Sequence, residues 1–123
     1  MKNNIKVTSE TKYIPDRSSQ IKSYYFFSYK IRIKNNTPNS VQLLSRYWHI
    51  IDGNGMCEDI HGPGVVGRFP LINPGGFYDY TSFCPLKTPI GFMEGSFRMK
   101  TKNDNEFDIK IDRFRLMANQ LLN

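Results

Sequence analysis

The sequence predicts an all-β fold, a β-sandwich of about seven short antiparallel strands. Apolar and polar residues alternate with a period of two along the chain, whereas helical periodicity is almost absent. Clusters of Gly, Pro, Asn and Asp separate the alternating segments. A chain of 123 residues, 39% of them hydrophobic, is long enough for one packed core. We therefore expect a single domain over 1–123, with a core at about 5–116 and a tail at 117–123.

The first two expected strands lie at 4–8 and 24–35. The second is the clearest strand of the chain, because every odd-numbered residue from Tyr25 to Ile33 is apolar. The even-numbered residues from Ser28 to Lys34 are polar or basic. This alternation is typical of a strand with one buried and one solvated face. The Asn- and Pro-containing segment 35–39 then predicts a turn.

The next strand is expected at 41–52, and it carries the only tryptophan, Trp48, which we expect in the core. The sequence Asp-Gly-Asn-Gly at 52–55 is a strong hairpin signal, because Asn and Gly tolerate positive φ angles. A two-residue loop at Gly53-Asn54 predicts a register that pairs Ile51 with Met56, His49 with Glu58, Trp48 with Asp59 and Arg46 with His61.

Three further strands are expected at 77–83, 91–101 and 106–112. Turn-forming segments at 74–76, 88–91 and 102–105 separate them. The segment from Arg115 to Asn123 is expected either to add a helical turn or to fray.

The net charge of +6 is concentrated in residues 1–34, which hold eight Lys or Arg against two acidic residues. Such a segment either attracts a polyanion or forms a solvated strand face. The second interpretation is favoured because the basic residues are spread out, so nucleic acid is not an expected partner. The chain has neither an apolar run long enough for a membrane span nor a signal-peptide core. A cytoplasmic location, with Cys57 and Cys84 as reduced thiols, is the expectation.

Residues 62–67 contain the motif G-x-G-x-x-G, at Gly62, Gly64 and Gly67. In a dinucleotide-binding fold this motif opens a helix, but 68–76 contains two prolines and a Gly-Gly pair and cannot form one. Two interpretations remain. The loop amides form a nest that binds an anion such as pyrophosphate, or the glycines only permit a tight turn. Positive charge for an anion site would come from Arg46, His61 and Arg68.

The sequence gives little support for a metal site or a catalytic site. The soft ligands are His49, His61, Cys57 and Cys84, and their spacing matches no C-x-x-C or H-x-x-x-H pattern. There is no G-x-S-x-G motif, and the adjacent acids Glu58 and Asp59 are expected on opposite faces of a strand. We expect no catalytic residues, no metal and no cofactor, and hence not an enzyme.

Four segments together resemble the ApaG family, over about Ile5 to Leu116: 41–48, 62–67, 77–82 and 88–95. The resemblance implies a fibronectin type III-like, or immunoglobulin-like, sandwich and brings no reaction with it. It also implies an association with cobalt and magnesium tolerance, and a protein-binding role inferred for similar eukaryotic domains. A suggested pyrophosphate-binding motif of the family would map to Gly62, Gly64 and Gly67. The chain departs from the family pattern at Tyr47, Arg68 and Gly76, which weakens any shared metal or anion site.

These observations favour a non-catalytic binding module that contacts a protein partner. The aromatic pair Tyr24 and Phe26 is a candidate interface if both rings face solvent. The alternative is a binder of nucleotide or pyrophosphate, such as a diadenosine polyphosphate, through the glycine loop. Association into a homo-oligomer stays open.

Overall fold

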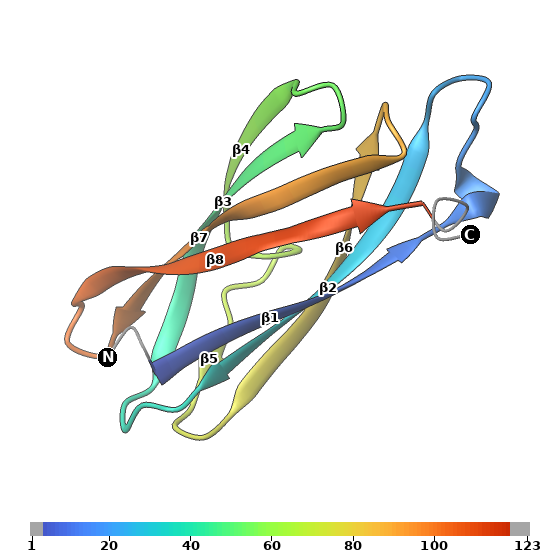
Figure 1. Cartoon of the computed structure of the whole chain (residues 1–123). Coiled ribbons are helices and arrows are strands. Elements are labelled where there is room, and N and C mark those ends of the chain that lie inside the picture. Colours follow the sequence, from blue (N-terminus) through green and yellow to red (C-terminus); the bar gives the residue numbers. More distant parts are fainter. Residues whose placement is uncertain (1–3, 119–123) are drawn as a thin grey trace.

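The computed structural model describes residues 4–118, in which two antiparallel sheets pack face to face (Figure 1). The elements in chain order are β1 (Ile5–Tyr13), η2 (Pro15–Arg17), β2 (Tyr25–Asn35), β3 (Val41–Asp52), β4 (Cys57–Pro63), β5 (Leu71–Ile72), β6 (Phe77–Leu86), β7 (Ile90–Thr101) and β8 (Glu106–Met117). One sheet has the order β1-β2-β6, and the other has the order β4-β3-β7-β8 with β5 paired to β3. The prediction of a fibronectin type III-like β-sandwich is confirmed.

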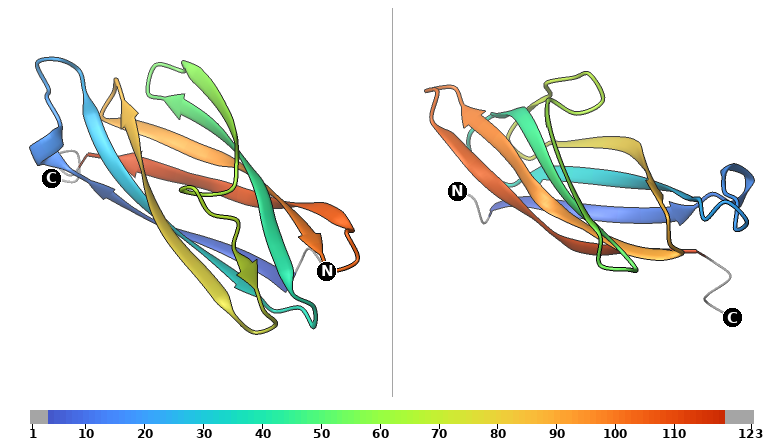
Figure 2. Two further views of the ribbon diagram at one scale, coloured as in Figure 1. Left: turned by 180° about the vertical axis from the view of Figure 1, so that it is seen from behind. Right: turned by 90° about the horizontal axis from the view of Figure 1, so that it is seen from above.

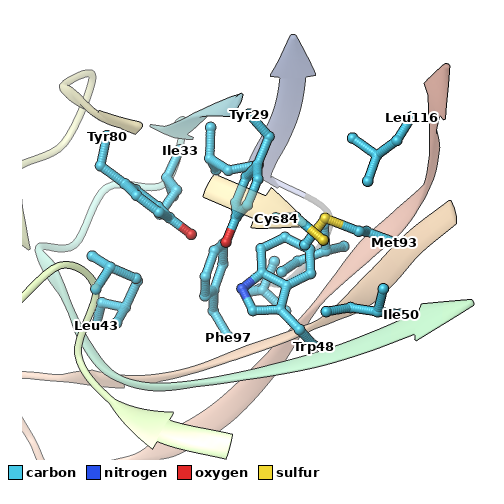
Figure 3. Packing of buried hydrophobic residues seen from close by; sticks show 14 of the residues in the cluster. Tyr29, Ile33, Leu43, Trp48, Ile50, Tyr80, Cys84, Met93, Phe97 and Leu116 are labelled. Carbon is cyan, nitrogen blue, oxygen red and sulfur yellow. The ribbon is translucent and has the colours of Figure 1, made fainter. Parts of the chain in front are cut away.

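The core lies between the sheets and follows the predicted alternation. Phe27, Ile31 and Ile33 on β2 are fully buried, while Lys30 and Arg32 between them are exposed. Trp48 is only 2% exposed, as expected for a core residue. Its indole packs edge-on against three aromatic rings, two of which, Tyr29 and Phe97, are labelled in Figure 3. These rings belong to Tyr29, Phe97 and Phe114, at centroid distances of 5.4, 6.2 and 5.8 Å.

The hairpin between β3 and β4 forms where it was predicted, but the predicted register is wrong by one residue. The observed pairs are Ile51 with Cys57, Ile50 with Glu58, His49 with Asp59, Trp48 with Ile60, Tyr47 with His61 and Arg46 with Gly62. The loop is longer than two residues, because the carboxylate of Asp52 accepts hydrogen bonds from the N–H groups of Asn54 (2.8 Å) and Met56 (3.0 Å). Gly55, with a φ of 83°, is the residue that takes the left-handed conformation.

The β8 strand continues through Met117, with Ile90 paired to Met117 and Leu116 fully buried. The expectation that Arg115 begins a helical or frayed tail is therefore wrong as far as Met117, because Leu116 supplies one more core side chain. The rest of that expectation, over 119–123, lies outside the described residues. Within residues 4–118 there is no helix long and apolar enough to cross a membrane.

The two long sides of the sandwich differ. On one side β1 packs next to β8. On the other side the outer strands are β6 and β4, and the segment 64–76 crosses from the end of β4 to the start of β6 (Figure 2, left). Gly64 and Gly67 of the glycine motif and the short strand β5 belong to this crossing segment, whereas Gly62 is the penultimate residue of β4. The glycine motif, which is the strongest suggestion of binding in the sequence, therefore lies on the side of the sandwich where the outer strands of the two sheets do not pack against each other.

Candidate functional site

The glycine segment folds into a tight turn at the end of β4. The N–H of Val65 donates to the carbonyl of Arg68 (2.9 Å), and the N–H of Arg68 donates back to the carbonyl of Val65 (3.0 Å). The two central residues, Val66 and Gly67, have φ angles of 48° and 75°. Positive φ at both central positions is the signature of a type I′ turn, in which the second residue is commonly glycine.

This geometry uses three of the loop amides that could otherwise form an anion nest. The N–H of Gly64 donates to the carbonyl of Leu44 (2.9 Å), and those of Val65 and Arg68 donate to each other's carbonyls. A Cβ built on Gly64 would lie 2.3 Å from the carbonyl oxygen of Arg68, so the turn itself requires that glycine. A nest presents successive free N–H groups to its ligand. The geometry therefore favours the interpretation of the glycines as turn formers.

Arg46 and His61 lie on opposite faces of the β4-β3-β7-β8 sheet. The structure therefore separates two basic side chains that were expected to share one anion site. Arg46 lies opposite Gly62 on β4, and its guanidinium donates to the carbonyls of Pro63 (2.9 Å) and Gly64 (3.0 Å). His61 pairs with Tyr47 and stacks on its ring at 4.6 Å, on the outer face. Arg46 thus supports the loop from within the sandwich.

A cluster of three aromatic rings, here called the aromatic ridge, lies on the outer face of the β1-β2-β6 sheet and consists of Tyr24, Phe26 and Phe83. Phe26 stacks on Phe83 (5.4 Å) and on Tyr24 (6.2 Å), and the guanidinium of Arg17 lies 4.5 Å from its ring centre. Tyr24 is 41% exposed and Phe83 is 51% exposed, but Phe26 is only 8% exposed. The expectation of a solvent-facing ring is right for Tyr24 and wrong for Phe26, because its neighbours cover it.

Basic side chains continue along the same outer face. Five cations of β1 and β2 alternate with the core-facing residues: Lys6, Lys12, Lys30, Arg32 and Lys34. Asp79 on β6 accepts two hydrogen bonds from Arg32, both at 2.8 Å, and this contact holds the pKa of the Asp79 carboxyl below its usual range. Lys6 lies directly opposite Lys34, a like-charge pair that works against folding. The predicted solvated basic strand face is therefore confirmed.

The outer face of the other sheet carries a polar cluster centred on Asp59. Its Oδ1 lies 2.6 Å from Nδ1 of His49 and accepts a hydrogen bond from the Tyr47 hydroxyl at 2.7 Å. The contact with His49, followed by that with Tyr47, lowers the pKa of Asp59. A carboxylate–histidine pair orients a base in many enzymes, but a reaction also needs a nucleophile within reach. Of the hydrogen bonds described within residues 4–118, none brings a serine, threonine or cysteine side chain to this pair.

The remaining candidate ligands and nucleophiles stay apart. Cys57 is exposed, Cys84 is buried, and both are free thiols. Burial raises the pKa of the Cys84 thiol to about 12, so this group is almost wholly protonated at neutral pH. Glu58 and Asp59 lie on opposite faces of β4, as predicted. Within residues 4–118 no three side chains of His, Cys, Asp or Glu come together as a metal site.

Two packed antiparallel sheets of this order define the class of the protein, a small fibronectin type III-like β-sandwich. The model of the ApaG domain family matches residues 15–101, which is well over half of the sequence. The chain belongs to the ApaG domain family.

Curated relatives and solved structures agree with this assignment. The ApaG protein of Mesorhizobium japonicum is 50% identical over 113 residues, covering 92% of this chain and 87% of that relative. The ApaG protein of Rhizobium meliloti is 44% identical over 112 residues, covering 91% and 86%. A crystal structure of a Bordetella pertussis protein described as ApaA matches with a TM-score of 0.90 at 38% identity, covering 93% of each chain. The names of these relatives state no reaction.

Sequence reasoning missed Phe83, the most exposed ring of the aromatic ridge. It sits opposite Ser28 only because β6 pairs with β2, a contact between segments far apart in the chain. In any strand over 77–83, Phe83 and Tyr80 fall on opposite faces. The partners of Phe83, however, depended on sheet order, which alternation does not specify.

Proposed function

We propose that this ApaG domain is a non-catalytic binding module that docks a protein partner on the outer face of β1-β2-β6. The observation that carries the proposal is the exposed aromatic ridge beside a row of cations. Ile21, in the loop before β2, is also a large apolar residue that is 98% exposed. An apolar centre with a charged rim is the usual composition of a protein interface.

The charges of this face specify the partner. Lys30, Arg32 and Lys34 lie in the β2 row that leads away from the ridge, and Asp79 is close to only the first two. A partner that buries Phe83 in an apolar pocket and presents carboxylates to this row matches the surface in both shape and charge. Aromatic anchors supply most of the affinity in such complexes, whereas rim charges mainly raise the association rate.

A protein fits this surface better than a single-stranded nucleic acid does. Nucleic-acid platforms offer free ring faces on which bases stack. Here the rings of Phe26 and Phe83 stack on each other, and Arg17 covers Phe26. Phe77, the other exposed ring of this face, is covered by the guanidinium of Arg32 at 4.0 Å.

The association with cobalt and magnesium tolerance, which the resemblance implies, is proposed to act through the partner. Within residues 4–118 no set of three metal-ligating side chains is assembled. Nucleotide or pyrophosphate binding at the glycine loop is the weaker candidate, because the amides of Gly64, Val65 and Arg68 already have partners.

Site-specific photo-crosslinking tests the proposal. A benzophenone amino acid replaces Phe83 in one variant and the exposed Asp108, on the other sheet, in a matched control. The expected result is a discrete protein adduct at position 83 that is absent at position 108. Binding of the identified and purified partner should then weaken by tenfold or more, roughly, in Phe83→Ala and Tyr24→Ala. Charge reversal of Lys30 should slow association.

Three outcomes would overturn the proposal. Equal adducts at positions 83 and 108 would mean that the ridge is not selective. An adduct formed only with a second copy of this chain would make the face a self-association surface. Tight binding of a dT oligonucleotide that is lost in Phe83→Ala would identify the partner as nucleic acid instead.

A further inference from the structure

A cavity of about 270 Å³ lies between β3, β4 and β6, on the side of the sandwich away from β1 and β8. Much of its wall is apolar, formed by Ile50, Ile60 and Met93 and by the edge of β6 at Phe83 and Pro85, whose side chains lie on the outer face. It also reaches Trp48 and Tyr29 in the core. Ligand pockets for drug-sized molecules usually measure about 300 to 1,000 Å³, so this cavity suits a smaller molecule.

Two buried hydrogen-bonding groups in this part of the core have no partner: one belongs to Trp48, which lines the cavity, and the other to Tyr80, which points toward Trp48 from outside the lining. The indole Nε1 of Trp48 and the hydroxyl of Tyr80 are fully buried and make no hydrogen bond within the described residues. Trp48 is 2% exposed and Tyr80 is 8% exposed. Figure 3 shows the indole nitrogen and the hydroxyls of Tyr29 and Tyr80 pointing toward one another. A buried donor without a partner is unfavourable, so the convergence of these groups calls for an acceptor.

Arg46 supplies a positive charge at the same end of the cavity. Its guanidinium lines the cavity, and one of its nitrogens, Nη1, donates to the carbonyls of Pro63 and Gly64. Within residues 4–118 no carboxylate forms an ion pair with it. The other guanidinium nitrogens are therefore left for an anionic acceptor, and the planar fork suits a carboxylate.

The opposite end of the cavity carries a negative charge, that of Glu58. Arg46 lies opposite Gly62, four residues from Glu58 along β4, which corresponds to roughly 13 Å of strand. A ligand with its anionic group at Arg46 therefore points its chain along the apolar wall and keeps its charge away from Glu58.

We propose that this cavity binds a small aliphatic monocarboxylate. The carboxylate accepts hydrogen bonds from Arg46 and Trp48, and the hydrocarbon chain lies against Ile50, Ile60 and Met93. A phosphate dianion fits less well, because its larger charge is more costly to desolvate beside an apolar wall. One water molecule occupies about 30 Å³ of liquid, so a single water would satisfy the donors but leave most of the cavity unfilled.

Trp48 makes a direct test available, since it is the only tryptophan of the chain. Its single indole N–H resonance is followed by NMR while sodium hexanoate is added to the ¹⁵N-labelled full chain. Matched titrations use 1-hexanol, which keeps the tail without the charge, and inorganic phosphate, which keeps a charge without the tail. The expected result is a saturable shift with hexanoate at up to the order of 10 mM, and much weaker responses to the other two.

Variants locate the carboxylate. Arg46→Gln removes the charge and should weaken hexanoate binding about tenfold. Glu58→Gln should tighten it slightly. The control is Arg98→Gln, on the outer face of the β4-β3-β7-β8 sheet, which should bind hexanoate like the parent. Thermal unfolding followed by circular dichroism confirms that each variant is folded.

An indole resonance that stays unmoved by hexanoate would overturn the proposal and leave ordered water as the occupant. An equal response to hexanol would mean an apolar cavity without carboxylate recognition, and stronger binding of phosphate would mean a general anion site. The titration of the parent chain decides between these outcomes even if Arg46→Gln fails to fold.

Discussion

The fold requires glycine at position 95, because there is no room for a side chain there. Gly95 lies on β7 opposite Trp48, and a Cβ built there would lie 1.9 Å from the carbonyl oxygen of Tyr47. The clash is with backbone, so it is relieved only by moving β3 away from β7. Gly95→Ala should therefore lower the free energy of unfolding by about 2 kcal/mol or more, measured by urea denaturation. The control Ser96→Ala, on the next residue, should change it by less than about 0.5 kcal/mol. Equal stability of the two variants would contradict this packing.

Asp59 predicts a pH dependence of stability. Its pKa is lowered in the folded state by His49 and then by Tyr47, whereas in the unfolded chain it is near 3.9. A lowered folded pKa gives stability that is fully present above the unfolded pKa and is lost as the pH falls through the folded pKa. From about pH 5 downward, the free energy of unfolding of the parent should fall more steeply than that of Asp59→Asn.

Carbon-detected NMR of the Asp59 carboxyl gives the direct measurement. The pKa should be below the ordinary range in the parent and should rise in His49→Gln, with a smaller rise in Tyr47→Phe. An ordinary pKa in the parent would show that the contact at 2.6 Å is not populated in solution.

Single residues were predictable from the sequence where the chemistry was local. The burial of Trp48 and the alternation along β2 needed only periodicity. The partners of Arg46 were not predictable, because its guanidinium contacts Pro63 and Gly64, carbonyls of the following strand and its turn. The motif G-x-G-x-x-G suggested a ligand, whereas the backbone uses those glycines for its own turn.

At the scale of elements, strand positions followed from the sequence better than strand pairing did. The strand 41–52 was predicted with both its ends, yet the β3–β4 register differs by one residue. The side chain of Asp52 decides this, because it accepts two amide hydrogen bonds and thereby lengthens the loop. Because side chains alternate across a strand, the loop length decides which carboxylate meets His49. That residue is Asp59, where Glu58 was expected.

The turn at 65–68 yields a prediction at this scale. Val66 is a β-branched residue at a φ of 48°, a conformation that is costly for it. Val66→Asn creates the favoured Asn-Gly pair of a type I′ turn and should raise the free energy of unfolding by about 1 kcal/mol. Gly67→Ala, at a φ of 75°, should lower it by a similar amount. In urea denaturation, Val66→Asn should be more stable than the parent and Gly67→Ala should be less stable. A loss of stability in Val66→Asn would mean that Val66 makes contacts worth more than its strain.

For the whole molecule, the period-two pattern was enough to predict a sandwich, since half of each strand had to be buried. The period-two pattern carried no information on which strands lie next to each other at the two sides of the sandwich. One side is covered by β1 against β8, and on the other the cavity next to Trp48 lies between β6 and the β3–β4 hairpin. The candidate carboxylate site depends on this asymmetry, which arises from sheet order and from the crossing segment 64–76.

The two cysteines provide a chemical test of this arrangement. Cys57 is exposed, whereas Cys84 lies in the wall of the cavity. Burial raises the pKa of Cys84 to about 12, so at pH 8 only about one thiol in ten thousand is ionised. With a thiol-reactive disulfide reagent, the native chain should therefore show one fast reaction. A second, much slower reaction should become fast in urea. Cys57→Ser should retain only the slow phase, and hexanoate should slow it further if the cavity binds a carboxylate. Fast labelling of Cys84 in the native Cys57→Ser variant would mean that β6 separates readily from the β3–β4 hairpin and that the Cys84 thiol is not shielded from the reagent.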